Sequence, residues 1–186
     1  MGRIFLTSDT HIGHDREFLW GPRGCKNIQE HNNWVEQRFL SVLEPDDDLY
    51  ILGDVMLGDN SIGMEYLRRL PCRIHIVRGN HDTDTRWELY KTLPNVVEMA
   101  DVIRLKYGKY RFYLSHYPTL TGNLESEHLT QMEINLYGHT HQQTNFFKDM
   151  PFMYHVGVDS HDCLPVLIDD IIEECRAKVK ECIDYL

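Results

Sequence analysis

Short runs of apolar residues, rich in β-branched and aromatic side chains, recur along the chain at residues 4–6, 49–52, 74–77, 112–114, 134–137 and 152–158. Each run has the length and composition of a β-strand. Several are apolar without alternation, which is typical of strands that are buried on both faces of a sheet. The Tyr-Gly-Lys-Tyr segment at 107–110 predicts the turn of a β-hairpin.

Between and after these runs, apolar residues recur at intervals of three and four, which predicts amphipathic helices. One stripe consists of Trp34, Val35, Phe39, Val42 and Leu43 before Pro45; a second of Ile62, Tyr66, Leu67 and Leu70 before Pro71; a third of Ile168, Ile172, Cys175, Val179, Cys182 and Leu186. Asp169 and Asp170 stand near the start of the third helix, where carboxylates interact favourably with the helix dipole. Strands mixed with helices predict an α/β layered domain.

Composition supports one globular domain over residues 1–186, with 42% hydrophobic and 26% charged residues and no repeat or linker-like segment. No segment approaches the ~20 apolar residues that cross a bilayer, and the N-terminus has no basic-then-apolar leader. We therefore expect a cytoplasmic protein without a membrane partner. Five cysteines without a Cys-x-x-Cys pair predict reduced, mostly buried thiols.

The formal net charge of −10 repels long polyanions unless a local positive centre outweighs it. This balance disfavours a protein that coats nucleic acid. It leaves open an acidic scaffold whose carboxylates hold metal ions.

Residues that can bind a metal follow five of the predicted strands. They are Asp9 and His11, Asp54, Asn80 and His81, His116, and His139 and His141. In open α/β sheets, binding sites gather beyond the carboxyl ends of the strands, so we expect these side chains to meet. A single Asp or Asn after a strand is usually a turn residue, but the repetition at five strand ends favours a shared metal site. Glycines 53, 79 and 138 are expected to let the backbone turn sharply before the ligand residues.

Four histidines with carboxylates and without a cysteine ligand favour Mn, Fe, Zn, Co or Ni. The number of candidate ligands exceeds what one ion needs. Two ions about 3.5–4 Å apart and bridged by a carboxylate would accommodate them.

Five motifs occur in order along the chain: Asp-Thr-His at 9–11, Gly-Asp at 53–54, Gly-Asn-His-Asp at 79–82, His116, and Gly-His-Thr-His at 138–141. This series resembles the calcineurin-like metallophosphoesterases. The resemblance implies two mixed β-sheets in a sandwich flanked by helices. It also implies hydrolysis of a phosphate ester by a metal-bridging hydroxide.

The resemblance assigns roles to the motif residues. It implies that Asp9, His11 and His141 bind one metal ion, that Asn80, His116 and His139 bind the other, and that Asp54 bridges the two. It makes His81 the group that protonates or stabilises the leaving oxygen. Consecutive residues at a strand end point to opposite sides, so Asn80 and His81 are not expected to face the same ion.

Elementary electrostatics agrees with this assignment. Two carboxylates and two divalent cations leave a formal charge of roughly +2, or about +1 with a bridging hydroxide. Such a centre attracts a phosphate ester in spite of the negative net charge. Asn80 would coordinate through its carbonyl oxygen without adding negative charge, which preserves the Lewis acidity of the site.

The chain departs from the protein-phosphatase branch of this family, in which an Asp three residues after the bridging Asp orients the catalytic histidine and an adjacent Arg holds phosphate. Here Leu57 and Gly58 occupy those positions. This difference argues against phosphoprotein phosphatase activity. It leaves Asp82, or as the less favoured choice Asp59, to orient His81, and we count Asp82 with His81 as the catalytic pair.

Several weaker signals surround the motifs. His14 is either a contact of the site or a polar loop residue, and Arg16 and Arg23 are expected to be solvated surface cations unless they supply charge to a phosphate. The segment 155–161 resembles the Asn-Val-Gly-Val-Asp stretch of small bacterial and phage phosphoesterases, with His155 in place of Asn, and should border the cleft. The roles of His155 and His161 stay open, and His31, His75 and His128 are interpreted as ordinary histidines.

The sequence therefore predicts a dinuclear, metal-dependent phosphoesterase, with Mn favoured and a small phosphate ester as its partner. Phosphodiesters are favoured slightly over monoesters, because all seven ligand positions are filled and no capping domain is present. One alternative is a nuclease, which would need a basic groove with stacking aromatic rings. Another is a scaffold that has the fold without catalysis. The oligomeric state stays open.

Overall fold

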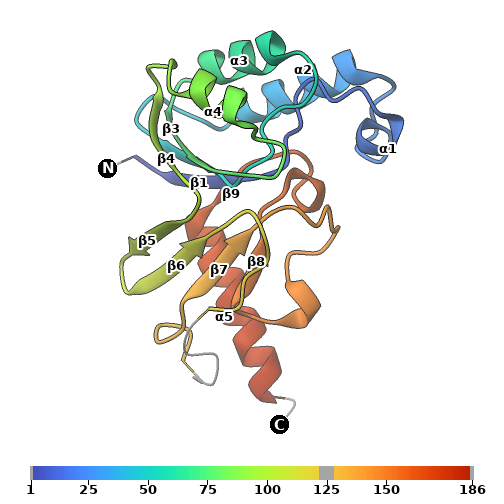
Figure 1. Cartoon of the computed structure of the whole chain (residues 1–186). Coiled ribbons are helices and arrows are strands. Elements are labelled where there is room, and N and C mark those ends of the chain that lie inside the picture. The colour runs from blue at the N-terminus through green and yellow to red at the C-terminus, as the bar shows by residue number, and fades with distance from the viewer. Residues whose placement is uncertain (1, 122–127, 185–186) are drawn as a thin grey trace.

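The computed structural model describes residues 2–121 and 128–184 and contains two β-sheets (Figure 1). The first sheet has the order β4-β3-β2-β1-β9, formed by β1 (Ile4–Thr7), β2 (Asp48–Ile51), β3 (Arg73–Val77), β4 (Val96–Ala100) and β9 (Val166–Leu167). Only β9 pairs antiparallel in this sheet. The second sheet has the order β5-β6-β7-β8, formed by β5 (Ile103–Tyr107), β6 (Tyr110–Leu114), β7 (Ile134–Tyr137) and β8 (Met153–His155). Here β5 pairs antiparallel, so both sheets are mixed, as predicted.

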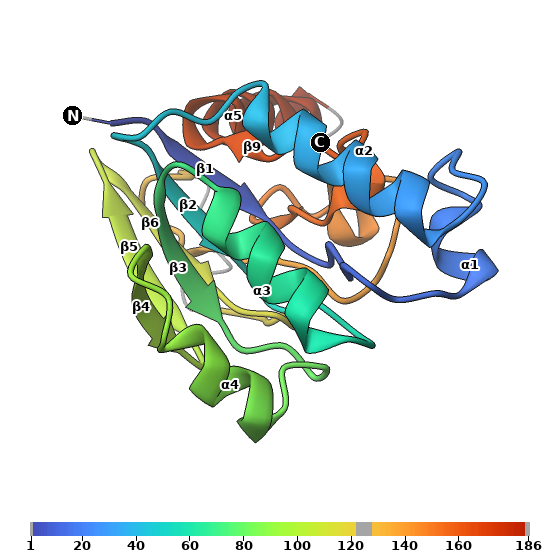
Figure 2. The same ribbon diagram turned by 90° about the horizontal axis from the view of Figure 1, so that it is seen from above.

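Helices lie on the outside of the sheets. They are α1 (Glu17–Trp20), α2 (Ile28–Leu40), α3 (Asn60–Arg69), α4 (Asp84–Tyr90) and α5 (Ile168–Asp184), with the short 3-10 segments η1 (Phe147–Asp149) and η2 (Val158–Ser160). Helices α2, α3 and α4 lie over the first sheet (Figure 2), and α5 runs beside the second sheet (Figure 1). Side-chain caps begin three of them: Asn27 accepts a hydrogen bond from the Glu30 amide, Asp59 from the Ser61 amide, and Thr83 from the Arg86 amide.

The interior strands β1 and β2 are buried on both faces of the first sheet because their apolar residues pack alternately into two cores. Along β1, Phe5 packs into the core beneath α2 and α3, whereas Leu6 packs into the core shared with the second sheet. Leu49 and Ile51 repeat the first orientation, and Tyr50 repeats the second. Successive side chains point to opposite faces of a strand. The sequence pattern of unbroken apolar runs is thereby explained.

Some predicted details differ from the structure. Trp34 and Ile62 were placed on buried helical stripes, yet they are 41% and 44% exposed. The Trp34 ring instead packs against the Arg38 guanidinium, whose Cζ lies 5.1 Å from the ring centroid. The strand predicted at 152–158 is limited to β8, and β4, β9, α1 and α4 were not predicted by the apolar pattern. β5 was implied only by the hairpin turn predicted at 107–110. Leu186 lies outside the described residues.

The expected hairpin and the mostly buried cysteines agree with the fold, although Cys182 of the third apolar stripe is exposed. The predicted hairpin turn joins β5 to β6, where Tyr107 pairs with Tyr110. Cys25, Cys72, Cys163 and Cys175 are free and buried, and Cys182 is free and exposed. Across residues 2–121 and 128–184, none of the helices combines the length and the apolar character of a membrane span.

Candidate metal centre

Five of the seven predicted metal ligands have a left-handed backbone. The φ angle is 58° at Asp9, 49° at His11, 54° at Asp54, 68° at His139 and 48° at His141. A residue other than glycine held in this region costs of order 1–3 kcal/mol, and such residues concentrate at functional sites. Backbone hydrogen bonds hold two of these residues in place: the Asp9 amide donates to the Gly53 carbonyl and the His11 amide to the Asp54 carbonyl, each at 3.1 Å. The loops after β1 and β2 therefore fix each other.

The three motif glycines serve two different purposes. Gly53 has a φ of 89°, which fits the expected sharp turn. Gly79 and Gly138 do not have a positive φ, so the expectation of a turn is wrong for them. A Cβ atom at Gly79 would lie 2.3 Å from Asp54 Oδ1, and one at Gly138 would lie 1.9 Å from Ser8 Oγ. These two positions need glycine because neighbouring loops approach the backbone closely.

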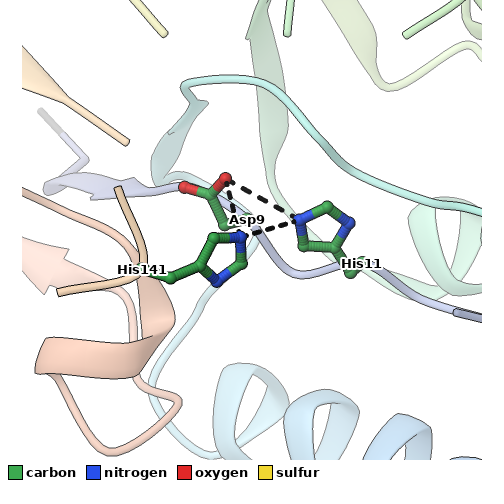
Figure 3. Close-up of side chains that lie close together, drawn as sticks. All are labelled: Asp9, His11 and His141. Atoms are coloured by element: carbon green, nitrogen blue, oxygen red, sulfur yellow. Dashed lines mark hydrogen bonds and ion pairs between the residues drawn. The ribbon is translucent and has the colours of Figure 1, made fainter. Parts of the chain in front are cut away.

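Asp9, His11 and His141 form the first cluster, and their side chains converge (Figure 3). The Nε2 atoms of His11 and His141 lie 3.2 Å apart, and each lies 3.8 Å from Asp9 Oδ1. The residues come from the loops after β1 and β7, which belong to different sheets. Burial lowers the pKa of His11 to about 2, so its imidazole is neutral, which is the form that binds a metal.

Asn80, His116 and His139 form the second cluster. The Asn80 Oδ1 atom lies 2.9 Å from both His116 Nε2 and His139 Nδ1, which are themselves 3.2 Å apart. His116 Nδ1 donates to the Leu52 carbonyl at 2.8 Å, which directs Nε2 into the cluster.

Asp54 lies between the two clusters. Its Oδ2 atom is 3.5 Å from His116 Nε2 in the second cluster and 3.7 Å from His11 Nε2 in the first. The other oxygen, Oδ1, accepts a hydrogen bond from the His81 amide at 2.8 Å. One carboxylate oxygen thus faces both clusters, which is the position a bridging ligand requires. The structure brings together all seven residues that the sequence singled out.

The donor atoms fit two divalent cations. Asp9 Oδ1 is buried without a hydrogen-bond partner among the described residues, and a buried, uncompensated carboxylate is costly. The same oxygen faces two imidazole nitrogens that also face each other. A cation between these atoms would satisfy all three. The nitrogen and oxygen donors, without sulfur, suit Mn, Fe, Zn, Co or Ni.

A buried ion pair supports the first cluster. The Arg23 guanidinium donates to both oxygens of Asp159, at 2.8 and 2.9 Å, and Asp159 Oδ2 accepts from His141 Nδ1 at 2.8 Å. The side chains of Arg23 and Asp159 are only 2% and 7% exposed. Burial alone would raise the pKa of Asp159, but its hydrogen bonds with His141 and Arg23 hold it well below the usual range.

The interpretation of Arg23 as a solvated surface cation is therefore wrong. Arg23 also donates to the backbone carbonyls of Asp9 and Thr10 and contacts His31 Nε2 at 2.8 Å. Because the guanidinium has only donors, His31 Nε2 accepts this bond. His31 is a buried, hydrogen-bonded histidine, as expected, and burial lowers its pKa to about 4. Arg23 thus connects three parts of the chain beside the first cluster.

His81 faces the first cluster and stays accessible. Its side chain is 39% exposed, its Nε2 atom is 4.0 Å from Asp54 Oδ2, and its ring centroid is 5.5 Å from that of His11. Asn80, the preceding residue, faces the second cluster, so the two side chains point different ways, as predicted. The His14 ring lies 5.4 Å from the His11 ring and 6.4 Å from the His81 ring, which places it at the edge of the site.

Asp82 does not orient the His81 ring in the described part of the chain. Its Oδ2 accepts from the amides of Asp54 and Gly79 at 2.9 and 2.8 Å, and its Oδ1 accepts from the Tyr90 hydroxyl at 2.8 Å. The carboxylate is 2% exposed and ties the loop after β2 to the loop after β3. Asp59, the alternative, caps α3 by accepting from the Ser61 amide. The expectation that either residue orients His81 is therefore corrected.

The segment 155–161 borders the site, as expected. Asp159 contacts His141, and Gly157 forms a β-bridge with Ser8, next to Asp9. His155 is fully buried, and its Nδ1 contacts Ser160 Oγ at 2.8 Å. His161 Nε2 donates to the His155 carbonyl at 2.8 Å. Both histidines hold the shape of this segment.

Comparisons with known proteins agree with the geometry. The chain is similar to the uncharacterized protein MJ1445 of Methanocaldococcus jannaschii, with 27% identity over 93% of this chain and 91% of that protein. It is similar to the Gene 66 protein of Mycobacterium phage D29, with 28% identity over 93% of this chain and 99% of that protein. Its fold is similar to that of AQ665 from Aquifex aeolicus, a protein of unknown function, with a TM-score of 0.69, 24% identity and coverage of 93% and 99%.

A family model establishes the relationship. The model of the calcineurin-like phosphoesterase superfamily domain matches residues 3–157, a range that contains all seven clustered residues and His81. The family is generally dependent on two metal ions, in agreement with the two clusters of candidate ligands. The chain therefore belongs to the calcineurin-like phosphoesterase superfamily and is a metal-dependent phosphoester hydrolase.

Proposed function

We propose that this protein hydrolyses a small phosphodiester with two divalent metal ions, Mn being the first choice. The observation that carries the proposal is the position of Asp54 Oδ2, within 3.7 Å of a histidine nitrogen of each cluster. Asp9, His11 and His141 would hold one ion, Asn80, His116 and His139 the other, and Asp54 both. Such ions would polarise the phosphoryl oxygens and lower the pKa of the attacking water.

His81 would assist departure of the leaving group. Its ring stands beside the first cluster with 39% of the side chain exposed, so it can reach a substrate oxygen without displacing a ligand residue. Its carbonyl accepts from Arg86 Nη1 at 2.6 Å and its amide donates to Asp54. These bonds fix the backbone of His81 relative to the bridging carboxylate. A protonated imidazole held there can donate to the departing alkoxide.

The contacts of the Arg23 guanidinium support a phosphodiester substrate rather than a monoester. A phosphate monoester dianion needs more positive charge than a diester monoanion, and an arginine commonly supplies it. The Arg23 guanidinium is occupied by Asp159 and by two backbone carbonyls. Arg23 therefore neutralises the charge of Asp159 and is not available to a substrate phosphate.

Hydrolysis assays with a matched variant test this function. Bis-p-nitrophenyl phosphate should be hydrolysed with Mn present, more efficiently than p-nitrophenyl phosphate, and chelation should abolish turnover. His81→Ala serves as the control for contaminating phosphatases, because it should still bind metal while its turnover falls about 10²- to 10⁴-fold. The proposal would be refuted if the Mn-loaded wild-type protein hydrolysed neither of the two esters.

Two further measurements separate the alternatives. Elemental analysis should find about two metal ions per chain, whereas a non-catalytic scaffold needs none. Single- and double-stranded oligonucleotides should be poor substrates, because the net charge of −10 opposes binding of long polyanions. Cleavage of oligonucleotides in preference to the small diester would establish the nuclease instead.

A further inference from the structure

A cavity of about 300 Å³ opens beside the second cluster of candidate metal ligands. Asn80 and His116 form part of its wall, together with Tyr117, Val102 and Asp101. A group bound there would be continuous with a phosphate held at the second cluster. His81 does not line this cavity; its ring lies 5.5 Å from that of His11 in the first cluster.

Tyr117 gives this cavity a planar aromatic wall. Its ring centroid lies 4.6 Å from that of His139 and 5.1 Å from that of His116, with interplanar angles of 63° and 72°. The two imidazoles therefore meet the tyrosine ring at steep angles and hold it in position. Tyr117 nevertheless remains 49% exposed. A ring that is held on one side and exposed elsewhere offers a surface for stacking.

A second exposed apolar side chain lines the same cavity. This is Val102, which is 37% exposed. Single apolar residues on a surface need no explanation, but ligand pockets are typically lined by apolar and aromatic side chains together with a few polar groups. The surface charge is mixed, since Asp101 and Arg78 both line the cavity. This surrounding favours a neutral group over a second anionic one.

We propose that this cavity is the subsite for the organic group that stays on the phosphate when the phosphodiester is cleaved, and that it selects a planar ring, which stacks on Tyr117. The inference rests on the proposed phosphoesterase function and names its substrate class: phosphodiesters in which this retained group is that of an aromatic or heteroaromatic alcohol or of a nucleoside. The volume is at the lower limit for ligand pockets, so one ring system fits. Tyr117 is thus the specificity-determining residue of the site.

Binding of three phosphonates to the Mn-loaded protein tests the subsite without turnover, because their carbon–phosphorus bonds resist a phosphoesterase. Phenylphosphonate carries a planar ring, cyclohexylphosphonate a ring of similar size that is not planar, and methylphosphonate no ring. Isothermal titration calorimetry should show phenylphosphonate binding about tenfold more tightly than methylphosphonate, with cyclohexylphosphonate between them.

Two variants locate the ring. Tyr117→Ala should reduce the affinity for phenylphosphonate to about that for methylphosphonate, which should itself be unchanged, and Tyr117→Phe should restore the preference. Phe18→Ala is the matched control, because Phe18 is a 72% exposed ring next to His14, near the first cluster. It should leave the preference intact.

The outcomes distinguish the subsite from the function. Equal affinities for the three phosphonates, or a preference lost in Phe18→Ala and kept in Tyr117→Ala, would overturn the subsite and leave the phosphoesterase proposal standing. Failure of all three phosphonates and of inorganic phosphate to bind the loaded protein would instead contradict the phosphoesterase proposal itself. Metal content measured on each variant shows whether the second cluster is still intact.

Discussion

Arg23 and Asp159 are 136 residues apart in sequence and form a buried ion pair with two hydrogen bonds. Asp159 also accepts the Nδ1 proton of His141, which leaves Nε2 of His141 directed at Asp9. A carboxylate behind a metal-binding histidine fixes its tautomer and orientation and increases its basicity. Arg23 in turn holds the carboxylate. The first cluster therefore depends on a residue that does not face it directly.

Arg23→Met should weaken metal binding at the first cluster. Loss of such an outer contact lowers metal affinity about 10- to 100-fold, and a buried charge left without its partner destabilises a protein by about 3–5 kcal/mol. Manganese titration by calorimetry should show one weakened site and one unchanged. Arg38→Met is the control: its pair with Asp162 is more exposed, at 25% and 77%, and should contribute less than about 1 kcal/mol. Equal effects of both variants would contradict the proposed role of Arg23.

His81 and His116 should separate catalysis from metal binding. His81→Ala is expected to keep both metal ions and lower kcat by about 10²- to 10⁴-fold, the usual contribution of a general acid. His116→Ala should lose the ion of the second cluster, because His116 Nε2 faces both Asn80 and Asp54. Measurements of metal content and steady-state kinetics on the two variants test these roles. An empty site in His81→Ala would show that the division of roles is wrong.

Replacement of Asp82 should lower the free energy of unfolding. In Asp82→Ala the amides of Asp54 and Gly79 and the Tyr90 hydroxyl lose their acceptor, and each unsatisfied buried group costs about 1–3 kcal/mol. Tyr90→Phe, which removes one of these bonds, should cost about 1 kcal/mol. Urea unfolding of the metal-free proteins measures both values. If Asp82→Ala kept its stability and changed only the pH dependence of kcat, Asp82 would act through His81 after all.

Asp9 should stabilise the protein only when metal is bound. Without metal, Asp9 Oδ1 is a buried charge without a hydrogen bond from the described residues, and burial raises the pKa of this carboxyl group. Asp9→Asn removes the charge, and its amide oxygen can still accept from the His139 amide as Asp9 Oδ2 does at 2.8 Å. The metal-free variant should be more stable than wild type by about 1 kcal/mol.

Thermal melts with and without Mn test this expectation. Manganese should raise the melting temperature of the wild-type protein, because each bound ion stabilises the folded state by about 2.7 kcal/mol at a hundredfold excess over its Kd. The melting temperature of Asp9→Asn should rise less. A metal-free variant that is less stable than wild type would show that Asp9 has a structural role independent of the ion.

The seven clustered residues could be predicted from the sequence because each follows an apolar strand, and the carboxyl ends of these strands meet in the fold. The role of Arg23 could not be predicted from the sequence. Its partner Asp159 comes close only in the tertiary structure, and the local sequence does not distinguish a buried arginine from an exposed one. Asp82 was assigned to the wrong partner for a similar reason. Its neighbour in sequence is His81, but its hydrogen bonds go to the loop after β2 and to α4.

The position of β1 in the first sheet determines when its contacts can form during synthesis of the chain. This strand lies between β2 and β9. One of its edges therefore stays unpaired until Val166 and Leu167 have been synthesised. The loop after it lacks its partners until His141 and Asp159 have been synthesised. At about 5–20 residues per second, a ribosome needs roughly 8–30 s to extend the chain from Asp9 to Asp159. A nascent chain therefore exposes Asp9 and His11 long before their partners exist. Metal uptake at the first cluster would therefore have to follow synthesis of the segment that carries His141 and Asp159.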